Sequence, residues 1–329
     1  MNLHKNTQDF QNAIQATSEF LGIRDIFIEK DYWVTYILKQ LSKSEFKDEV
    51  VFKGGTSLSK AYDVISRFSE DVDLVLIGRN GLSGNQIKAK IKKIEKVLII
   101  FPLEEDTTFK PSKGSKFRKT GYKYPRVLDD YVFGHTEESL ILEINAFANP
   151  YPDEIREIES YITKFFRKTY ASYIADYELE SFKIKVLDIK RTLIEKILSL
   201  ARFSISDNEN YDVLRGKVRH FYDIHKLMLE REISDFIVSK DFKKTIEKAI
   251  EDDLSNPEFK DSWKNTKLKE VRLFGDIDNV FKSITNIYNN DFSALLYDGE
   301  EVKLEAIRKS FNKLISTIPN IDISNEEKR

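Results

Sequence analysis

The chain has 329 residues, of which 41% are hydrophobic and 33% charged, and its formal net charge is −2. This composition is typical of a soluble globular protein with one or two domains, and the small net charge excludes nucleic-acid binding through a global positive field. Because the sequence has no cysteine, no apolar signal core and no apolar run that approaches a membrane span, we expect a soluble cytoplasmic protein without disulfides or thiolate sites.

The N-terminal part of the chain alternates helical and strand-like segments. Apolar residues recur at helical spacing over residues 7–44 and predict two helices there. Strand-like segments follow at 50–52, 71–77 and 139–147. We expect a short helix between the first two strands and a longer helix, from about Asn85, between the last two. This order indicates a mixed α/β arrangement.

The C-terminal part of the chain has a different character. From about Asp188 the strand signals fade, and amphipathic stretches such as KRTLIEKILSLARF and KVRHFYDIHKLML take over. We therefore predict two domains: an α/β domain with N-terminal helices over residues 1–187, and a helical domain over residues 188–329.

A glycine turn precedes the expected short helix, in the stretch FKGGTSLSKAYDVISRFSEDVDLVLI at 52–77. Gly54 and Gly55 allow backbone conformations that are closed to other residues and let a ligand approach closely. Thr56 and Ser57 are good N-cap residues for a helix over LSKAYDVIS. A glycine turn that leads into a helix N-terminus predicts an anion site.

Two aspartates begin the strand that follows this helix. Asp71 and Asp73 are two residues apart, so both side chains leave the same face of the strand, about 6–7 Å apart. Such a pair can bind hard divalent cations such as Mg²⁺. The alternative is an ion pair at the start of a strand. The glycine turn, the helix and the DxD pair, in this order, favour nucleotide triphosphate chemistry.

A basic segment at residues 110–126 contains seven Lys or Arg and no acid, with Phe117, Tyr122 and Tyr124 interleaved. Basic groups can neutralise phosphates, and aromatic rings can stack on unpaired bases. The alternative is a solvated β-hairpin whose tyrosines face the core. The candidate RNA-binding residues are Lys113, Lys116, Arg118, Lys119 and Lys123.

These motifs resemble those of a known family. The order of glycine turn, helix and DxD is similar to the signature of the DNA polymerase β-like nucleotidyltransferase superfamily. The form KGGTSLSKAY…RFSEDVDL more closely resembles the AbiEii family, the toxins of type IV toxin–antitoxin systems. EKDYWV at 29–34, TLIEKILSLARF at 192–203 and RHFYDIHKL at 219–227 resemble further motifs of that family, so the resemblance covers roughly residues 28–229.

The resemblance implies roles for residues of the α/β domain. Asp71 and Asp73 match the metal-binding pair, and Glu143 is the candidate for a third acid on a neighbouring strand. A salt bridge on a half-exposed strand is the alternative for Glu143. The residues that the resemblance implies for nucleotide binding in this domain are Gly54, Gly55, Thr56, Ser57 and Ser69.

Two residues of the later helices also match the family's motifs. Lys196 matches the lysine that contacts the nucleotide phosphates, although it could instead extend to solvent from the flank of its helix. Asp223 matches the catalytic aspartate of the later helix, although an i,i+4 ion pair with Arg219 is an alternative.

The implied fold is α+β: a polymerase β-like domain with a mixed sheet and flanking helices, followed by a helical domain that completes the active-site cleft. The implied activity is Mg²⁺-dependent transfer of a nucleoside monophosphate from an NTP, with two metal ions, to an RNA hydroxyl, in particular the 3′ end of tRNA. The implied role is that of a toxin in a toxin–antitoxin or phage-defence system, with a winged-helix antitoxin as partner. A small-molecule or protein acceptor, or a non-catalytic nucleotide-binding module, are the alternatives.

Overall fold

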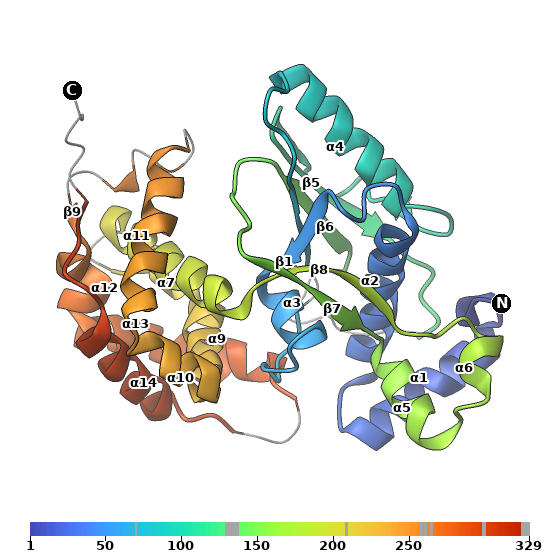
Figure 1. Cartoon of the computed structure of the whole chain (residues 1–329). Helices are drawn as coiled ribbons and strands as arrows, with labels where there is room; N and C mark the ends of the chain where they lie inside the picture. Colours follow the sequence, from blue (N-terminus) through green and yellow to red (C-terminus); the bar gives the residue numbers. More distant parts are fainter. Residues whose placement is uncertain are drawn as a thin grey trace. The chain divides into compact units, whose positions relative to one another are not determined.

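The computed structural model describes residues 1–69, 71–128, 138–207, 210–256, 259, 262–263, 266–297 and 301–323. The chain divides into two compact units. Unit 1 comprises Met1–Asp188 together with Tyr297, and unit 2 comprises Ile189–Leu296 together with residues 301–323. Figure 1 labels the elements of both units. The division after Asp188 lies one residue from the boundary expected from the sequence.

Among the described residues, unit 1 contains an eight-stranded mixed sheet in the order β3-β5-β6-β2-β1-β8-β7, with β4 paired to β5. β1 and β2 are antiparallel, whereas β2–β6 and β1–β8 are parallel. The three predicted strands are confirmed as β1, β2 and β6, and β4 and β5 form the hairpin given as an alternative for residues 110–126; the other strands were not predicted. The strands are β1 Val50–Lys53, β2 Asp71–Leu76, β3 Glu104–Glu105, β4 Ser112–Lys113, β5 Phe117–Lys123, β6 Leu140–Asn145, β7 Asp153–Ile158 and β8 Phe182–Leu187.

The helices of unit 1 begin and end at local sequence signals. The two helices predicted within residues 7–44 are confirmed, and the first ends where Gly22 adopts a left-handed conformation. The helix expected from about Asn85 is also confirmed, and it begins with a capping box between Ser83 and Gln86. The helices are α1 Thr7–Leu21, α2 Asp25–Lys43, α3 Gly54–Lys60, α4 Gly84–Leu98, α5 Tyr161–Thr169 and α6 Tyr173–Asp176, preceded by a 3-10 turn at Leu3–Lys5.

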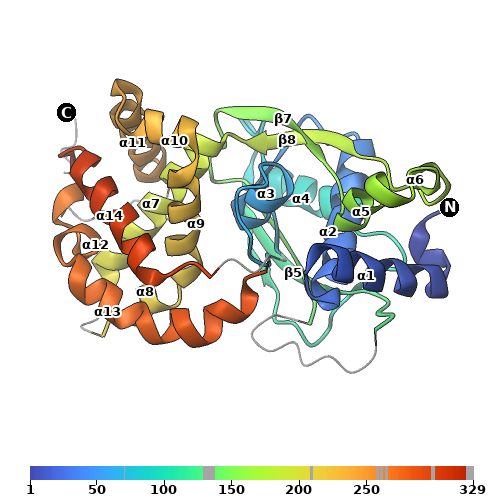
Figure 2. The same ribbon diagram turned by 90° about the horizontal axis from the view of Figure 1, so that it is seen from below.

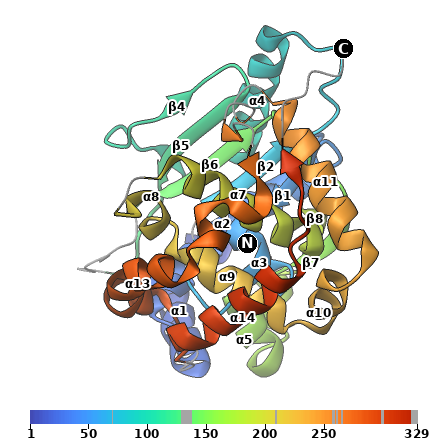
Figure 3. The same cartoon turned by 90° about the vertical axis from the view of Figure 1, so that its left-hand side faces the viewer.

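Side chains alternate between the two faces of the central strands. Val72 and Leu74 of β2, and Leu142 and Ile144 of β6, belong to the main hydrophobic core, which α2 and α4 cover. The intervening residues of these strands therefore point to the opposite face of the sheet. Figure 3 shows β5, β6 and β2 side by side.

Unit 2 is helical, as predicted, apart from a two-residue strand pair of β9 Thr266–Lys267 and β10 Asp322–Ile323. Its core includes packed aromatic rings of Phe221, Phe281 and Phe311. No helix in the described part of the chain has the length and apolar character to cross a membrane. The helices are α7 Ile189–Ser206, α8 Asp212–Arg215, α9 Val218–Leu229, α10 Arg231–Ile237, α11 Lys240–Leu254, α12 Arg272–Gly275, α13 Ile277–Ile287 and α14 Leu304–Thr317, with 3-10 turns at Leu268–Glu270 and Ser293–Leu295 and a π-helical turn at Tyr288–Phe292.

The EKDYWV motif places charged residues in the interior of unit 1, on the helix that packs against α1 and α5 (Figure 2). Asp31 forms an ion pair with Lys60 of α3 at 2.5 Å and accepts a hydrogen bond from the Tyr161 N–H at 2.8 Å. Glu29 accepts a hydrogen bond from the Val127 N–H at 2.8 Å. Because Asp31, Lys60 and Glu29 are all buried, these contacts fix α3 and the chain after β5 to α2.

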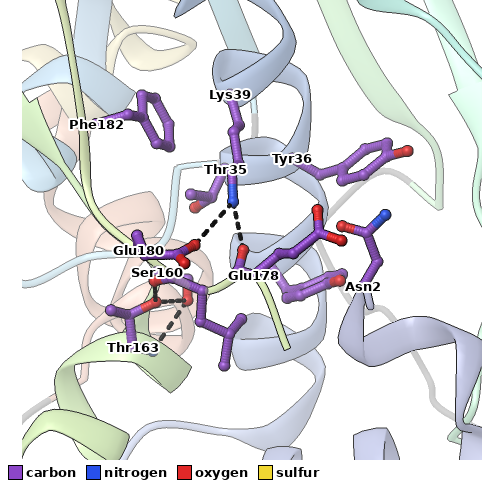
Figure 4. Close-up of a pocket in the computed structure, with 11 residues that line it drawn as sticks. Asn2, Thr35, Tyr36, Lys39, Ser160, Thr163, Glu178, Glu180 and Phe182 are labelled. Carbon is purple, nitrogen blue, oxygen red and sulfur yellow. Dashed lines mark hydrogen bonds and ion pairs between the residues drawn. The ribbon is translucent and has the colours of Figure 1, made fainter. Parts of the chain in front are cut away.

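A small cavity of about 30 Å³ lies beside α2 (Figure 4). Lys39 Nζ lies 3.5 Å from Glu180 Oε2 across this cavity and also donates a hydrogen bond to the Glu178 carbonyl oxygen. The Ser160 and Thr163 hydroxyls hydrogen-bond to each other. These polar groups bond to one another, and the cavity has room for a water molecule. We therefore interpret it as part of the packing around α2 rather than as a ligand site.

The buried Asp31–Lys60 pair leads to a stability prediction. Removing one partner leaves an uncompensated buried charge, so Asp31→Ala should lower the free energy of unfolding by about 3–5 kcal/mol, as measured by urea denaturation. Glu105→Ala, which removes the exposed Lys113–Glu105 pair at 2.7 Å, serves as the control and should cost less than about 1 kcal/mol. Equal losses in the two variants would contradict an anchoring role for Asp31.

Candidate active site

The three predicted carboxylates lie on one face of the sheet. β2 and β6 are parallel, and their register pairs Asp73 with Glu143. Asp71 and Asp73 occupy alternate positions of β2 and are half-buried, in contrast to the fully buried Val72 and Leu74. All three acids therefore point away from the hydrophobic core, and Asp71 and Asp73 share a face, as the DxD spacing predicted.

Two lysines flank these acids in the same row of the sheet. The antiparallel pairing of β1 with β2 places Lys53 beside Asp73, and the pairing of β5 with β6 places Lys119 beside Glu143. Lys119 Nζ lies 3.9 Å from Glu143 Oε2. The row Lys53–Asp73–Glu143–Lys119 thus crosses four strands, with the positive charges at its ends. Lys53 was not among the predicted site residues.

The pKa of Asp73 is strongly perturbed by its neighbours in this row. Burial of its carboxylate, together with the negative charges of Asp71 and Glu143, raises the pKa of Asp73 to about 8. Lys53 and Lys119 act in the opposite direction but do not cancel the effect. Asp73 therefore keeps a proton at neutral pH when no cation is present, and a bound cation would favour its ionised form.

The glycine turn lies against these acids. α3 begins at Gly54, directly after β1, and Gly54 has φ +85°, a backbone conformation that favours glycine. A Cβ atom at Gly54 would overlap the Asp73 carboxylate, and one at Gly55 would lie 2.6 Å from Arg67 Nη2 and 3.0 Å from Ser69 Oγ. The turn of Gly54 and Gly55, called the cradle below, therefore has no side chains of its own. It is bordered by the Asp73 carboxylate, the Arg67 guanidinium and the Ser69 hydroxyl.

The predicted caps of this helix are wrong. α3 starts at Gly54 rather than after Ser57, and it ends at Lys60. Thr56 and Ser57 lie inside its first turns. The Thr56 hydroxyl donates a hydrogen bond to Ser69 Oγ at 2.9 Å, and the Ser57 hydroxyl donates one to the Gly54 carbonyl at 2.9 Å. The Thr56 hydroxyl thus ties α3 to the chain just before β2, and the Ser57 hydroxyl bonds within the glycine turn, so neither caps a helix.

Arg67 is a site residue that the sequence reasoning missed. Its side chain is buried, and Nη1 donates a hydrogen bond to the Phe68 carbonyl at 3.0 Å. Its position two residues before Ser69 offered a weak signal, because only the fold brings the guanidinium to Gly55. There Arg67 Nη2 borders the glycine turn.

The basic segment 110–126 forms a hairpin of β4 and β5 whose alternation divides its cations between two faces. Arg118 pairs with the buried Glu95 of α4, whereas Lys119 faces the acids. Tyr122 and Tyr124 are buried, so the interpretation of these rings as base-stacking groups is wrong and the hairpin alternative is correct for them.

Three further lysines of the hairpin differ in their surroundings. Lys113 pairs with Glu105 at 2.7 Å, and Lys123 lies 3.6 Å from Asp106. Lys116 is exposed near the tip. Lys119 differs from these lysines, because it belongs to the charged row beside Asp73 and Glu143.

Lys196 and Asp223 pair with each other within unit 2. Lys196 of α7 and Asp223 of α9 are both buried, and Lys196 Nζ lies 2.7 Å from Asp223 Oδ2. The interpretation of Lys196 as a side chain that extends to solvent is therefore wrong. Asp223 lies in the interior rather than on a polar surface with Arg219.

The carboxylates of Asp71 and Asp73 suit a divalent cation that also binds phosphate oxygens and water. Among the described residues, no group of three or more His, Asp or Glu side chains is arranged to enclose a metal ion. Asp73 lies against Gly54. Glu143 Oε2 lies 3.9 Å from Lys119 Nζ, which is the salt bridge given as its alternative, and its role as a third ligand stays a prediction. Mg²⁺ commonly binds one or two carboxylates, with phosphate oxygens and water as further ligands, and Asp71 and Asp73 suit that arrangement.

One protein-family model matches most of the chain. The model of the family described as "Nucleotidyl transferase AbiEii toxin, Type IV TA system" matches residues 36–314. The chain belongs to the AbiEii family. It is therefore a nucleotidyltransferase of the toxin–antitoxin type, as the sequence motifs predicted. No curated protein matched the sequence.

Two solved structures are similar to the chain at low identity. JHP933 from Helicobacter pylori has a TM-score of 0.42 and 15% identity, with 89% of this chain and 91% of that chain covered. MenT4, a nucleotidyltransferase toxin from Mycobacterium tuberculosis, has a TM-score of 0.34 and 15% identity, with 87% and 94% covered. The AbiEii assignment depends on the family match alone.

The contact between Gly54 and Asp73 leads to a prediction about activity. Gly54→Ala should cost about 1–2 kcal/mol of stability from its positive φ and should also displace the Asp73 carboxylate, so nucleotide transfer should fall at least tenfold. Gly22→Ala is a matched control, because Gly22 has φ +68° but a Cβ there would contact nothing within 4 Å. Equal activity in the two variants would show that the cradle tolerates a side chain.

The raised pKa of Asp73 leads to a second prediction. Between pH 4 and pH 8 the folded state holds a proton on Asp73 that the unfolded state has lost, so this group makes stability fall as pH rises to about 8. Asp73→Asn removes that dependence. Without divalent metal, we expect the Asn variant to unfold at a higher temperature than wild type at pH 8, with a gain of more than about 1 kcal/mol, and to lose the advantage near pH 5. A constant difference across pH would refute this.

Proposed function

We propose that this AbiEii-family enzyme transfers a nucleoside monophosphate from an NTP to a hydroxyl of RNA, at the 3′ end of tRNA, with Mg²⁺ as cofactor. The observation that carries the proposal is the adjacency of Asp73, the Gly54–Gly55 cradle and Arg67 on the acid face of the sheet. Carboxylates for a cation and cationic or N–H donors for phosphates are the two requirements of triphosphate chemistry.

In this proposal each residue near the cradle has a part in binding the NTP. Asp71 and Asp73 hold the cations, two of which are expected. The backbone of Gly54 and Gly55 lets the phosphates approach closely, and the Arg67 guanidinium donates to them. Thr56 and Ser69 hold the turn in place through their hydrogen bond at 2.9 Å. When bound, Mg²⁺ neutralises phosphate charge and lowers the pKa of the acceptor hydroxyl.

Lys196 and Asp223 act as a pair in the same proposal. Lys196 contacts the NTP phosphates, and Asp223 orients it through their contact at 2.7 Å. A lysine in this role is a point charge that can follow the departing pyrophosphate. The acceptor oxygen attacks the α-phosphorus as the bond to pyrophosphate breaks, so the reaction requires positioning and charge stabilisation rather than a covalent enzyme intermediate.

The family membership supports a proposal for the acceptor and the partner. A type IV toxin has an antitoxin, and we propose a winged-helix protein for that role. RNA as acceptor requires exposed cations on the enzyme, and Lys116 is one within the hairpin. Lys113, Arg118, Lys119 and Lys123 face acidic partners within the fold, so they contribute less net positive charge than the sequence alone indicated.

The proposed function predicts how labelled nucleotide is transferred. The enzyme is incubated with each α-labelled NTP, Mg²⁺ and bulk tRNA or total RNA, and the RNA is separated on a denaturing gel. We expect label in RNA from wild type and a loss of at least about a thousandfold in Asp71→Ala/Asp73→Ala, because two charged ligands are removed. Asp48→Asn, an exposed aspartate of the same unit, is the control and should retain activity.

Two outcomes would overturn parts of this proposal. Label in RNA at the wild-type rate from the double variant would remove Asp71 and Asp73 from the site. Transfer to a small molecule or to a protein, with none to any RNA, would replace the RNA acceptor and leave the transferase chemistry intact.

A further inference from the structure

Helix α4 carries a concentration of positive charge that the sequence reasoning did not single out. Its 15 residues, GNQIKAKIKKIEKVL, contain five lysines and one acid, Glu95. Glu95 is buried, where it accepts hydrogen bonds from the Thr120 hydroxyl at 2.9 Å and the Tyr122 hydroxyl at 2.7 Å and pairs with Arg118. The outer surface of α4 therefore has no carboxylate of its own to compensate its lysines.

Helix α11 provides a contrast within the same chain. It also has 15 residues and four lysines, but five acids are interleaved with them in KDFKKTIEKAIEDDL. Lys243 pairs with Glu247 at 3.6 Å and Lys244 with Asp241 at 3.7 Å. α11 is thus an ordinary solvated helix surface, and α4 is not.

The lysines of α4 form a stripe along its exposed face. Lys88, Lys92 and Lys96 follow one another at i, i+4 and i+8, and all three are exposed and form no ion pair with a described residue. Successive members lie about 6 Å apart along the helix axis. Lys93 is exposed beside them, whereas Lys90 pairs with Glu49.

The stripe is continuous with the basic hairpin. A Cβ at Gly84, the first residue of α4, would lie 3.8 Å from the Cβ of Ser115 at the hairpin tip. Lys116, the next residue, is exposed. α4 itself lies over β5 and β6 of the same unit (Figure 1). An extended polyanion could therefore contact Lys116 and then the lysines of α4 in succession.

We propose that the stripe Lys88–Lys92–Lys96 of α4, with Lys93, binds the phosphate backbone of the RNA acceptor. This inference rests on RNA as the acceptor in the proposed function. The charge is complementary to a phosphodiester backbone, and it is local, as a chain with a net charge of −2 requires. The stripe identifies no base sequence, because lysine contacts to phosphates position a nucleic acid without reading it.

An anionic membrane surface is a less suitable partner for α4. An interfacial helix inserts its apolar face into the lipid. The apolar face of α4, which comprises Ile87, Ile91, Ile94 and Leu98, is buried in the core of unit 1. Exposed apolar side chains near α4 are confined to its end, at Val97, Ile100 and Phe101. Phe101, 85% exposed, offers a ring on which an unpaired base could stack.

The experiment measures RNA binding by the full chain as a function of salt. Fluorescently labelled bulk tRNA is titrated with wild type and with Lys88→Gln/Lys92→Gln/Lys96→Gln at several KCl concentrations. Glutamine preserves helix propensity, and thermal melting checks the fold. We expect the variant to bind at least about tenfold more weakly near 100 mM salt, and the log–log salt slope to fall by about 2, since each lost phosphate contact removes about 0.7–0.9.

Two matched variants make the result specific. Lys240→Gln/Lys243→Gln/Lys244→Gln on α11 changes the net charge equally and should leave affinity and slope unchanged. Lys88→Arg/Lys92→Arg/Lys96→Arg keeps the charge and should retain binding. In transfer assays, the α4 glutamine variant should raise KM for tRNA while KM for the NTP at saturating tRNA stays unchanged.

The outcomes separate this inference from the proposed function. Transfer of label to RNA with unchanged tRNA affinity and slope in the α4 variant would overturn the stripe and leave the proposed function intact. Equal losses in the α4 and α11 glutamine variants would reduce the effect to net charge and also overturn it. Lysine-dependent binding to vesicles with anionic lipid, without binding to tRNA, would assign α4 to a membrane instead. No transfer to any RNA by wild type would refute the acceptor itself.

Discussion

Like charges held close together by strand pairing are the constraint on which the candidate site depends. Asp73 and Glu143 are neighbours because β2 and β6 run parallel in a fixed register, and Asp71 adds a third negative charge on the same face. Carboxylates at this separation repel one another, and partial burial strengthens the repulsion because the local dielectric is low. The opposite faces of the same strands compensate, since each fully buried side chain such as Leu74 or Leu142 contributes about 1.5–3 kcal/mol. The hydrophobic core thus stabilises a charge arrangement that is useful only when a cation is present.

The surroundings of the acids limit that repulsion without removing it. Lys53 and Lys119 stand at the two ends of the row, where they lower the pKa of Asp73 only in part. The backbone also adapts, because glycine at position 54 leaves the space that the Asp73 carboxylate fills. α3 in turn is fixed to α2 through the Lys60–Asp31 pair. The Asp31–Lys60 ion pair in the interior of unit 1 therefore positions the glycine turn relative to the acids. The EKDYWV motif, which contains Asp31, thus affects the site through α3.

The sequence predicted those parts of the site that depend on local periodicity. The alternation of Asp71, Val72, Asp73 and Leu74 shows which side chains share a face of a strand, and the turn at Gly54 follows from glycine alone. Contacts between distant segments were not accessible in this way. Lys53 and Lys119 join the acids only through the registers of β1 and β5, and Arg67 reaches Gly55 only through the fold. The error at Thr56 has a similar origin, because its hydroxyl bonds to Ser69 rather than to the helix backbone.

The number of cations in residues 110–126 was a poor guide to the position of the basic surface, because strand geometry separates their side chains. Seven cations in residues 110–126 appear to be one patch, but a strand sends alternate side chains to opposite faces. Arg118 therefore meets Glu95 beneath α4, and Lys119 meets Glu143 beside the site. On α4 the reverse holds: lysines three or four residues apart share one helix face, and the only acid of the helix lies on the buried side. Net positive charge thus accumulates where helical spacing keeps it together, and it is dispersed where a strand with acidic neighbours divides it.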